Sequence, residues 1–207
     1  MKRTIILILA IWLVSAPYIY GATPIMGDTE LSVERMYQFV KSRNSDFQRE
    51  IAETFHRVGN RYGIRGDIAL CQAILETGWF RFSDGTAVDG QQFNYCGLGV
   101  LAKGMKGCAF SGIDEGVTAQ IQHLYAYASK APLPDGETLV DPRFGQVIRG
   151  CAKDWEKLNG RWAANNRYAE RILKLYRMMC EFDEAEVITV GIPDDLFDSL
   201  IDGKIPE

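Results

Sequence analysis

The sequence predicts a mainly helical α+β domain, and three observations lead to this fold class. Apolar residues recur at helical spacing through most of the chain. The most apolar of these periodic segments is followed by a long glycine-rich stretch in which the periodicity fails. The 207 residues are 47% hydrophobic and 24% charged, which is typical of one globular domain. We therefore expect a helical body with a small glycine-rich loop or β-lobe beside it.

Six segments have the apolar spacing of helices, and the sequence predicts them over residues 31–43, 46–62, 68–76, 114–129, 144–157 and 166–180. The third is almost entirely apolar, so we expect it to be largely buried. Asp67 is the expected N-cap of this helix, because its carboxylate can accept backbone N–H groups of the first turn. Gly78 is expected to end it in the left-handed conformation. Gly59 and Gly63 are expected to end the second helix.

The glycine-rich stretch covers residues 79–111 and has no helical period. Loops of this length in a compact domain are usually functional, because a rigid scaffold can present binding groups on them. We therefore expect this segment to form part of a site.

The charge distribution argues against one class of protein. A formal net charge of -4 gives no basic surface for nucleic acid, so no nucleic-acid partner is predicted. Residues 181–207 hold nine acidic residues against the single Lys204, and we interpret them as a solvated acidic tail. A monomer is expected.

The amino terminus has the pattern of a secretory signal peptide over residues 1–22. Lys2 and Arg3 precede an apolar run of twelve residues, which is shorter than the ~20 residues that a spanning helix needs. An uncleaved amino-terminal anchor is the alternative. In both cases the body is expected to be exported, as a secreted or cell-surface protein. If the signal peptide is cleaved, no stable membrane insertion is expected afterwards. Residues 23–45 are then a lead-in segment containing the first helix.

The cysteines and histidines indicate no metal site and no cofactor. His56 and His123 are far apart, and no cysteine pair has metal-ligand spacing. An exported chain can oxidise its five cysteines, but an odd number leaves at least one unpaired. Cys96 and Cys108 could close one loop, whereas Cys71 is expected to be a buried thiol. The five are Cys71, Cys96, Cys108, Cys151 and Cys180.

Glu76 is the strongest candidate for a catalytic residue. It ends the apolar helix and is followed by Trp79 and Phe80. A carboxyl group placed against aromatic surface loses solvation, which raises its pKa and suits a general acid. The alternative is a solvated glutamate in the last turn of a helix.

Several short motifs occur in a fixed order around and after Glu76. They are AILETGW at 73–79, NYCGL at 94–98, the segment 116–125, DPRF at 141–144, LNGRWA at 158–163, and Tyr168. This ordered set resembles the glucosaminidase-domain peptidoglycan hydrolases, whose catalytic helix closes with Glu-Thr-Gly or Glu-Ser-Gly. The resemblance covers roughly residues 47–179. It implies that residues 46–180 form the glucosaminidase domain.

The resemblance implies a lysozyme-like fold with a cleft that accepts a glycan strand of peptidoglycan. It also implies hydrolysis of the β-1,4 bond after N-acetylglucosamine, with Glu76 as the catalytic acid and no cofactor. Tyr168 matches a tyrosine that the family places at its active site, where it positions the acetamido group or a water. Packing of Tyr168 in the core is the alternative.

The identity of a second catalytic group stays open. An inverting glycosidase separates its two carboxyl groups by about 6.5–9.5 Å and a retaining one by about 5–5.5 Å. Candidates are Glu115, Asp84 and Asp89. Glu115 could instead compensate a helix dipole, and both aspartates precede glycine as turn residues do. The N-acetyl group of the substrate is a further possibility.

Six residues are candidates for binding sugar: Trp79, Phe80, Asn94, Tyr95, Gly97 and Trp162. The four aromatic rings among them could stack on the apolar faces of sugars, and packing in the core is their alternative. Phe93 departs from the family, which often has an asparagine there, so the polarity of the cleft is expected to differ.

Two further functions remain as alternatives to hydrolysis after N-acetylglucosamine. The first is a non-catalytic wall-binding module on the same scaffold. The second is a lytic transglycosylase or muramidase, which cuts on the other side of the disaccharide.

Overall fold

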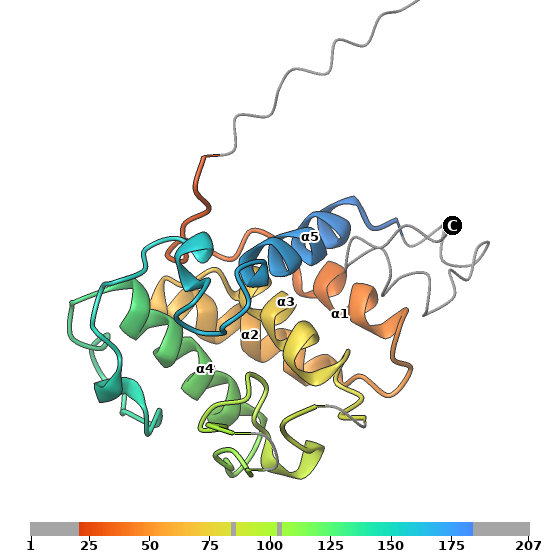
Figure 1. Ribbon diagram of the computed structural model, residues 1–207. Helices are drawn as coiled ribbons and strands as arrows, with labels where there is room; N and C mark the ends of the chain where they lie inside the picture. The colour runs from red at the N-terminus through yellow and green to blue at the C-terminus, as the bar shows by residue number, and fades with distance from the viewer. Residues whose placement is uncertain (1–20, 84–85, 103–104, 184–207) are drawn as a thin grey trace, which may run out of the picture.

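The computed structural model describes residues 21–83, 86–102 and 105–183, and this part of the chain is mainly helical, as predicted. Figure 1 shows one helix in the middle of the body, with the others around it. This central helix, α3, contacts each of the other four α-helices. The α-helices are α1 (Val33–Lys41), α2 (Arg49–Tyr62), α3 (Gly66–Thr77), α4 (Ile113–Ala128) and α5 (Tyr168–Glu181).

The prediction of a buried apolar helix is confirmed by α3, in which every residue from Gly66 to Ile74 is buried. Because α3 is apolar on all sides, it can be covered on all sides by other helices. Its C-terminal end is formed as expected, since Gly78 has a φ of 58° and caps the helix in the left-handed conformation.

Helices α2 and α3 touch through their backbones. A Cβ atom on Gly59 would lie 2.7 Å from the Cα of Gly66, and one on Gly66 would lie 2.2 Å from the carbonyl oxygen of Phe55. The prediction that Gly59 ends α2 is therefore wrong, because this glycine lies inside the helix and allows the close approach. Gly63, with a φ of 60°, is the C-cap.

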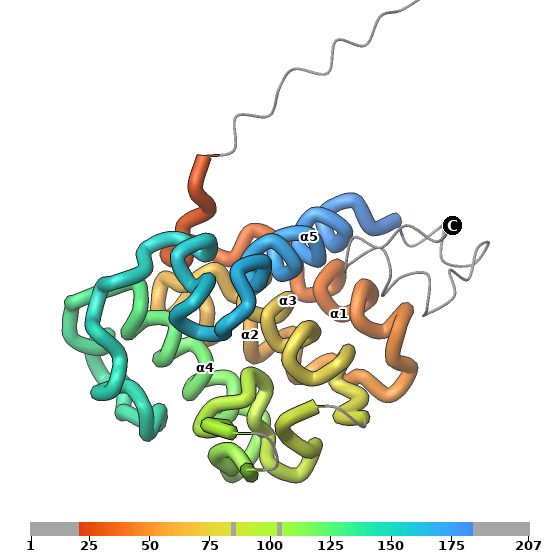
Figure 2. Tube along the Cα trace, in the orientation of Figure 1, coloured from red at the N-terminus to blue at the C-terminus, as the bar shows by residue number. Residues whose placement is uncertain are grey.

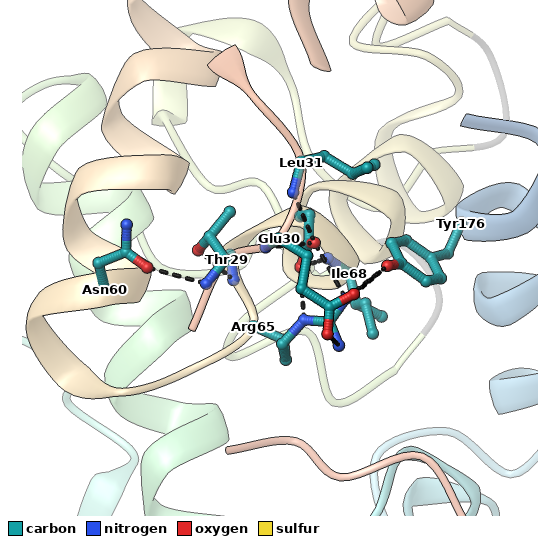
Figure 3. A network of polar contacts seen from close by, with 9 residues as sticks. Thr29, Glu30, Leu31, Asn60, Arg65, Ile68 and Tyr176 are labelled. Atoms are coloured by element: carbon teal, nitrogen blue, oxygen red, sulfur yellow. Dashed lines mark hydrogen bonds and ion pairs between the residues drawn. The ribbon is translucent and has the colours of Figure 1, made fainter. Parts of the chain in front are cut away.

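The N-terminus of α3 differs from the prediction at Asp67. Arg65 occupies the N-cap position, and Asp67 lies in the first turn with its carboxylate buried. That carboxylate accepts hydrogen bonds from Arg65 Nε at 3.0 Å and from the backbone N–H groups of Glu30 and Leu31 at 3.0 and 3.3 Å. Figure 3 shows how Arg65 also reaches Glu30 and the Tyr176 hydroxyl of α5. The network thus joins the amino-terminal segment to α3 and α5.

The predicted helix over residues 144–157 is wrong. This segment contains only two short 3-10 turns, Phe144–Gln146 and Trp155–Leu158. Two of its backbone N–H groups donate to the end of α4, from Gly150 N to the Ala126 carbonyl at 3.0 Å and from Ala152 N to the Tyr127 carbonyl at 2.9 Å. The apolar spacing reflects anchors such as Trp155, which is fully buried.

The glycine-rich segment is a loop region, the first of its two predicted alternatives. Between Gly78 and Gly112 its described residues contain one 3-10 turn, Gly90–Gln92, and no strand. β-Pairing in the described chain consists of isolated bridges, such as Met26 with Ile64. In Figure 2 the segment gathers at the C-terminal end of α3, beneath α4.

Three predictions concern segments outside the described residues. Residues 1–20 of the expected signal peptide, Asp84, and residues 184–207 of the acidic tail all lie there. Of the helices that the structure describes, none has the length and apolar character needed to cross a membrane.

Candidate active site

Glu76 lies in the last turn of α3, where its partly buried carboxyl group meets the start of α5. Its Oε1 atom accepts a hydrogen bond of 2.6 Å from the hydroxyl of Tyr168, the first residue of α5. Tyr168 is itself buried, with 4% of its surface exposed. The packing of α5 on α3 therefore places the two candidate catalytic residues in direct contact.

The glycine-rich loop approaches the other carboxyl oxygen of Glu76. A Cβ atom on Gly97 would lie 3.8 Å from Oε2, and Gly97 has a φ of 66°, which L side chains rarely adopt. The loop is held there by Asn94, whose fully buried side chain accepts from Leu98 N at 2.9 Å and donates to the carbonyls of Leu98 and Cys108 at 2.8 and 3.0 Å. Asn94 thus shapes the loop rather than facing solvent.

Burial raises the pKa of the Glu76 carboxyl above its ordinary value, because the charged form loses water. Three neighbours oppose this effect and favour the carboxylate: the Tyr168 hydroxyl, the positive charge of Arg171, and hydrogen bonding from the Trp162 indole. Desolvation has the larger effect. The side chain therefore keeps its proton to higher pH than a solvated glutamate, which is the property that a general acid needs.

Three of the six predicted sugar-binding residues are core residues. Trp79 packs on Phe39 at a ring distance of 5.4 Å, and Phe80 and Tyr95 pack on each other at 5.7 Å. The exposed fractions of Trp79, Phe80 and Tyr95 are 7%, 7% and 3%, which leaves little ring surface for a sugar. The prediction that these rings stack on substrate is therefore corrected to its alternative, packing in the core.

Trp162 is only partly buried and stays a candidate for sugar contact. Its indole packs edge-to-face on His123 at a ring distance of 4.9 Å. Behind this contact, His123 Nδ1 lies 2.8 Å from Oδ2 of the buried Asp141. The His123–Asp141 pair thus supports the ring that borders Glu76.

Two of the candidates for a second catalytic carboxylate are engaged in local capping. Glu115 Oε2 accepts 2.6 Å hydrogen bonds from both the backbone N–H and the hydroxyl of Ser111, and these bonds lower the pKa of Glu115. Asp89 caps the 3-10 turn Gly90–Gln92 through a 2.9 Å bond from Gln91 N. These contacts correspond to the alternatives of helix-terminus compensation and turn formation.

Three residues near Glu76 are not among the candidates predicted from the sequence. Arg171 lies one turn after Tyr168 on α5, and its charge acts on the Glu76 carboxyl. Gln72 and Gln120 form a buried chain of hydrogen bonds behind Tyr168. Gln72 had a detectable signal, since it is a polar residue in an otherwise apolar stretch and lies one turn before Glu76.

All five cysteines are free thiols in this structure. Cys71 is fully buried in α3, as predicted. Cys96 and Cys108 belong to one small apolar cluster beside the loop, without a bond between their sulfur atoms. In the described part of the chain, His, Cys, Asp and Glu side chains do not gather into groups of three that could hold a metal ion.

We expect replacement of Tyr168 by phenylalanine to raise the pKa of Glu76 further, because the hydroxyl hydrogen bond that favours the carboxylate is lost. If Glu76 acts as a general acid, the alkaline limb of the pH–rate profile moves to higher pH. The rate falls by about tenfold, the cost of one hydrogen bond that orients a buried charged group. The pH–rate profile of the variant measures both effects. A shift of the alkaline limb to lower pH would contradict this account of the contact.

Comparison with known proteins assigns the chain to a family. Residues 52–181 match the family model described as mannosyl-glycoprotein endo-beta-N-acetylglucosaminidase. An uncharacterized protein of Borreliella burgdorferi is 35% identical over 142 residues, which cover 69% of this chain and 68% of that protein. No solved structure matches the chain. The matched region contains Glu76, Gly97, Trp162 and Tyr168. The chain therefore belongs to the glucosaminidase family of glycoside hydrolases.

Proposed function

We propose that the protein is a secreted endo-β-N-acetylglucosaminidase that hydrolyses the β-1,4 bond after N-acetylglucosamine in peptidoglycan. The observation that carries this proposal is the environment of Glu76. A partly buried carboxyl group with a raised pKa accepts a 2.6 Å hydrogen bond from Tyr168 and is bordered by a glycine without a side chain. Membership of the family supplies the class of bond and substrate.

In the proposed reaction, protonated Glu76 is the general acid. Its proton passes to the oxygen that leaves C1 of N-acetylglucosamine as the glycosidic bond breaks. The Tyr168 hydroxyl orients the carboxyl group and stabilises the carboxylate that results. The absence of a side chain on Gly97 leaves space at Oε2, the oxygen that would face the substrate.

The capping contacts of Glu115 and Asp89 favour attack at C1 by the acetamido group of the substrate over attack by a protein nucleophile. In that route the acetamido oxygen of N-acetylglucosamine attacks C1 while the leaving oxygen takes the proton of Glu76. Water then attacks C1, the bond from the acetamido oxygen breaks, and Glu76 takes back a proton. Two displacements at C1 retain the β configuration, so the first product anomer is expected to be β.

The proposed location follows from the substrate, which lies outside the cytoplasmic membrane. A cleaved signal peptide over residues 1–22 would deliver the domain there, and glycan strands would be its partner. We propose that the enzyme acts as a monomer, because the described site is built from one chain: α3, α5 and the loop around Gly97.

The test is incubation of the purified protein with bacterial cell walls. We expect new reducing ends, with N-acetylglucosamine as the terminal sugar in the mass spectra of the fragments. Binding without release of fragments would identify a wall-binding module instead. Fragments that end in anhydro-muramic acid would identify a lytic transglycosylase, and a reducing muramic acid would identify a muramidase.

A further inference from the structure

A continuous chain of buried hydrogen bonds runs from α4 through α3 to Glu76. The Nε2 atom of Gln120 donates to Oε1 of Gln72 at 2.9 Å, and Nε2 of Gln72 donates to the Tyr168 hydroxyl at 2.8 Å. The Tyr168 hydroxyl then donates to Glu76 at 2.6 Å. Both glutamine side chains are fully buried.

The direction of this chain is determined at its far end by a backbone carbonyl. Gln120 Nε2 also donates to the carbonyl oxygen of Ala69 at 3.0 Å, and a carbonyl can only accept. Turning the Gln120 amide over would place its oxygen against that carbonyl. Gln120 Oε1 has no hydrogen-bond partner in the described structure, so this amide is held through its two N–H donors.

The donor and acceptor of each later hydrogen bond in this row are then determined. Since Gln120 presents an N–H to Gln72, Gln72 must accept with its oxygen and present its own N–H groups to Tyr168. A hydroxyl has one proton, so Tyr168 accepts from Gln72 and gives that proton to Glu76 Oε1. Oε1 of a protonated Glu76 is therefore occupied as an acceptor, and its acidic proton belongs on Oε2.

We propose that Gln72 and Gln120 are positioning residues that force the acidic proton of Glu76 onto Oε2, the oxygen that lies beside Gly97. This inference rests on the proposed function for its catalytic meaning. Without the two amides, the Tyr168 hydroxyl could accept the proton of Glu76 as readily as donate its own. Part of the population would then hold the proton on Oε1, directed away from substrate.

The same arrangement occurs a second time in this protein and provides a matched control. Gln122 Nε2 donates to the Tyr62 hydroxyl at 2.8 Å, and that hydroxyl donates to Glu137 Oε2 at 2.7 Å. Glu137 is also paired with Arg61 at 3.0 Å, so it is held as a carboxylate. The two chains share a buried glutamine, a tyrosine and a glutamate, but only one of them ends at Glu76.

The test measures the effect of Gln72→Leu in two backgrounds. One background is the wild-type protein, and the other already has the substitution Tyr168→Phe. The pKa of Glu76 is followed by NMR of its ¹³C-labelled carboxyl group, and wall lysis is followed as a function of pH. The other titratable groups near this carboxyl are Tyr168 and Arg171 of α5 and Cys96 of the loop. Arg171 and Cys96 are the same in all of these variants, and residue 168 is the same within each pair that is compared.

With Tyr168 present, we expect Gln72→Leu to raise the pKa of Glu76 by about half a unit to one unit and to slow lysis roughly three- to tenfold. The protonated form of Glu76 is then stabilised relative to the carboxylate, because it can donate a hydrogen bond to the Tyr168 hydroxyl. With Tyr168→Phe, the same substitution is expected to change neither quantity. Equal effects in both backgrounds, or an unmoved pKa with Tyr168 present, would overturn the proposal.

The control Gln122→Leu is expected to lower stability and leave the pKa of Glu76 unchanged. Should Gln72→Leu fail to fold, Gln120→Leu frees the Gln72 amide to turn over, and a smaller shift in the same direction is expected. The two proposals fail separately. Absence of glycan cleavage by the wild type would contradict the proposed function. The NMR titration would still test in which direction the hydrogen bonds between Gln120 and Glu76 run.

Discussion

Replacement of Glu76 by glutamine is expected to slow the release of reducing ends from cell walls by a factor of about 10²–10⁴. Glutamine is nearly the same shape as glutamate and can still accept from the Tyr168 hydroxyl, but it has no acidic proton to give. The loss should therefore appear in kcat, with wall binding retained. Release of reducing ends from purified walls measures the rate, and a pull-down with the same walls measures binding.

The same variant is expected to fold, and its stability should depend less on pH. The folded-state pKa of Glu76 is raised above the value in the unfolded chain. Between the two pKa values the folded protein holds a proton that the unfolded chain has lost, so stability falls as pH rises through this window. Glu76→Gln removes that decline. Urea unfolding at several pH values should show the variant matching the wild type at low pH and exceeding it above the folded pKa.

Glu137→Gln is the matched control for this substitution. Glu137 accepts from Tyr62 as Glu76 accepts from Tyr168, but its pKa is lowered by Tyr62 and Arg61. We expect the control to lyse walls at the wild-type rate. Equal lysis by Glu76→Gln and by this control would remove Glu76 from the mechanism.

Replacement of Arg65 by methionine is expected to lower the free energy of unfolding by about 3 kcal/mol. Arg65 donates to both carboxylate oxygens of the fully buried Asp67, at 3.0 Å each. Methionine fills a similar volume but leaves that carboxylate without its cation. Backbone N–H groups of Glu30, Leu31 and Ile68 still donate to Asp67. The loss of unfolding free energy is therefore expected at the low end of the range for a broken buried ion pair.

Chemical denaturation in urea measures this effect, and Arg49→Met is its control. Arg49 pairs with Glu34 and Glu53 on the surface, with 45% of its side chain exposed. Pairs of this kind contribute about 0–1 kcal/mol, so the control should unfold near the wild-type midpoint. Equal midpoints for the two variants would mean that the network in Figure 3 contributes little to stability.

The parts of the fold that depend on local pattern could be predicted from the sequence. The apolar stretch of α3 and the glycines at 63 and 78 describe elements whose formation needs only helical spacing and a left-handed cap. The prediction failed where tertiary contact decides the backbone. Residues 144–157 have helical spacing, but the N–H groups of Gly150 and Ala152 bond to carbonyls at the end of α4. Gly59 looks like a stop signal, and only the packing of α2 on α3 shows why it is needed inside a helix.

The candidate site was predictable at its centre and less so at its edges. Glu76 and Tyr168 are candidates from separate parts of the sequence, and the structure places their side chains in contact. Whether an aromatic ring faces a sugar or the core depends on which elements cover it, so burial of Trp79 could not be read from spacing. Gln120 gave no signal at all, because its role depends on two contacts across to α3.

The most direct test of the acid role of Glu76 is digestion of peptidoglycan in water labelled with ¹⁸O. The account predicts fragments that end in N-acetylglucosamine and carry one ¹⁸O atom at C1 when the wild type is used. Glu76→Gln should produce almost none of them in the same time. Labelled ends formed equally fast by the variant, or wild-type fragments without the label, would contradict the central claim.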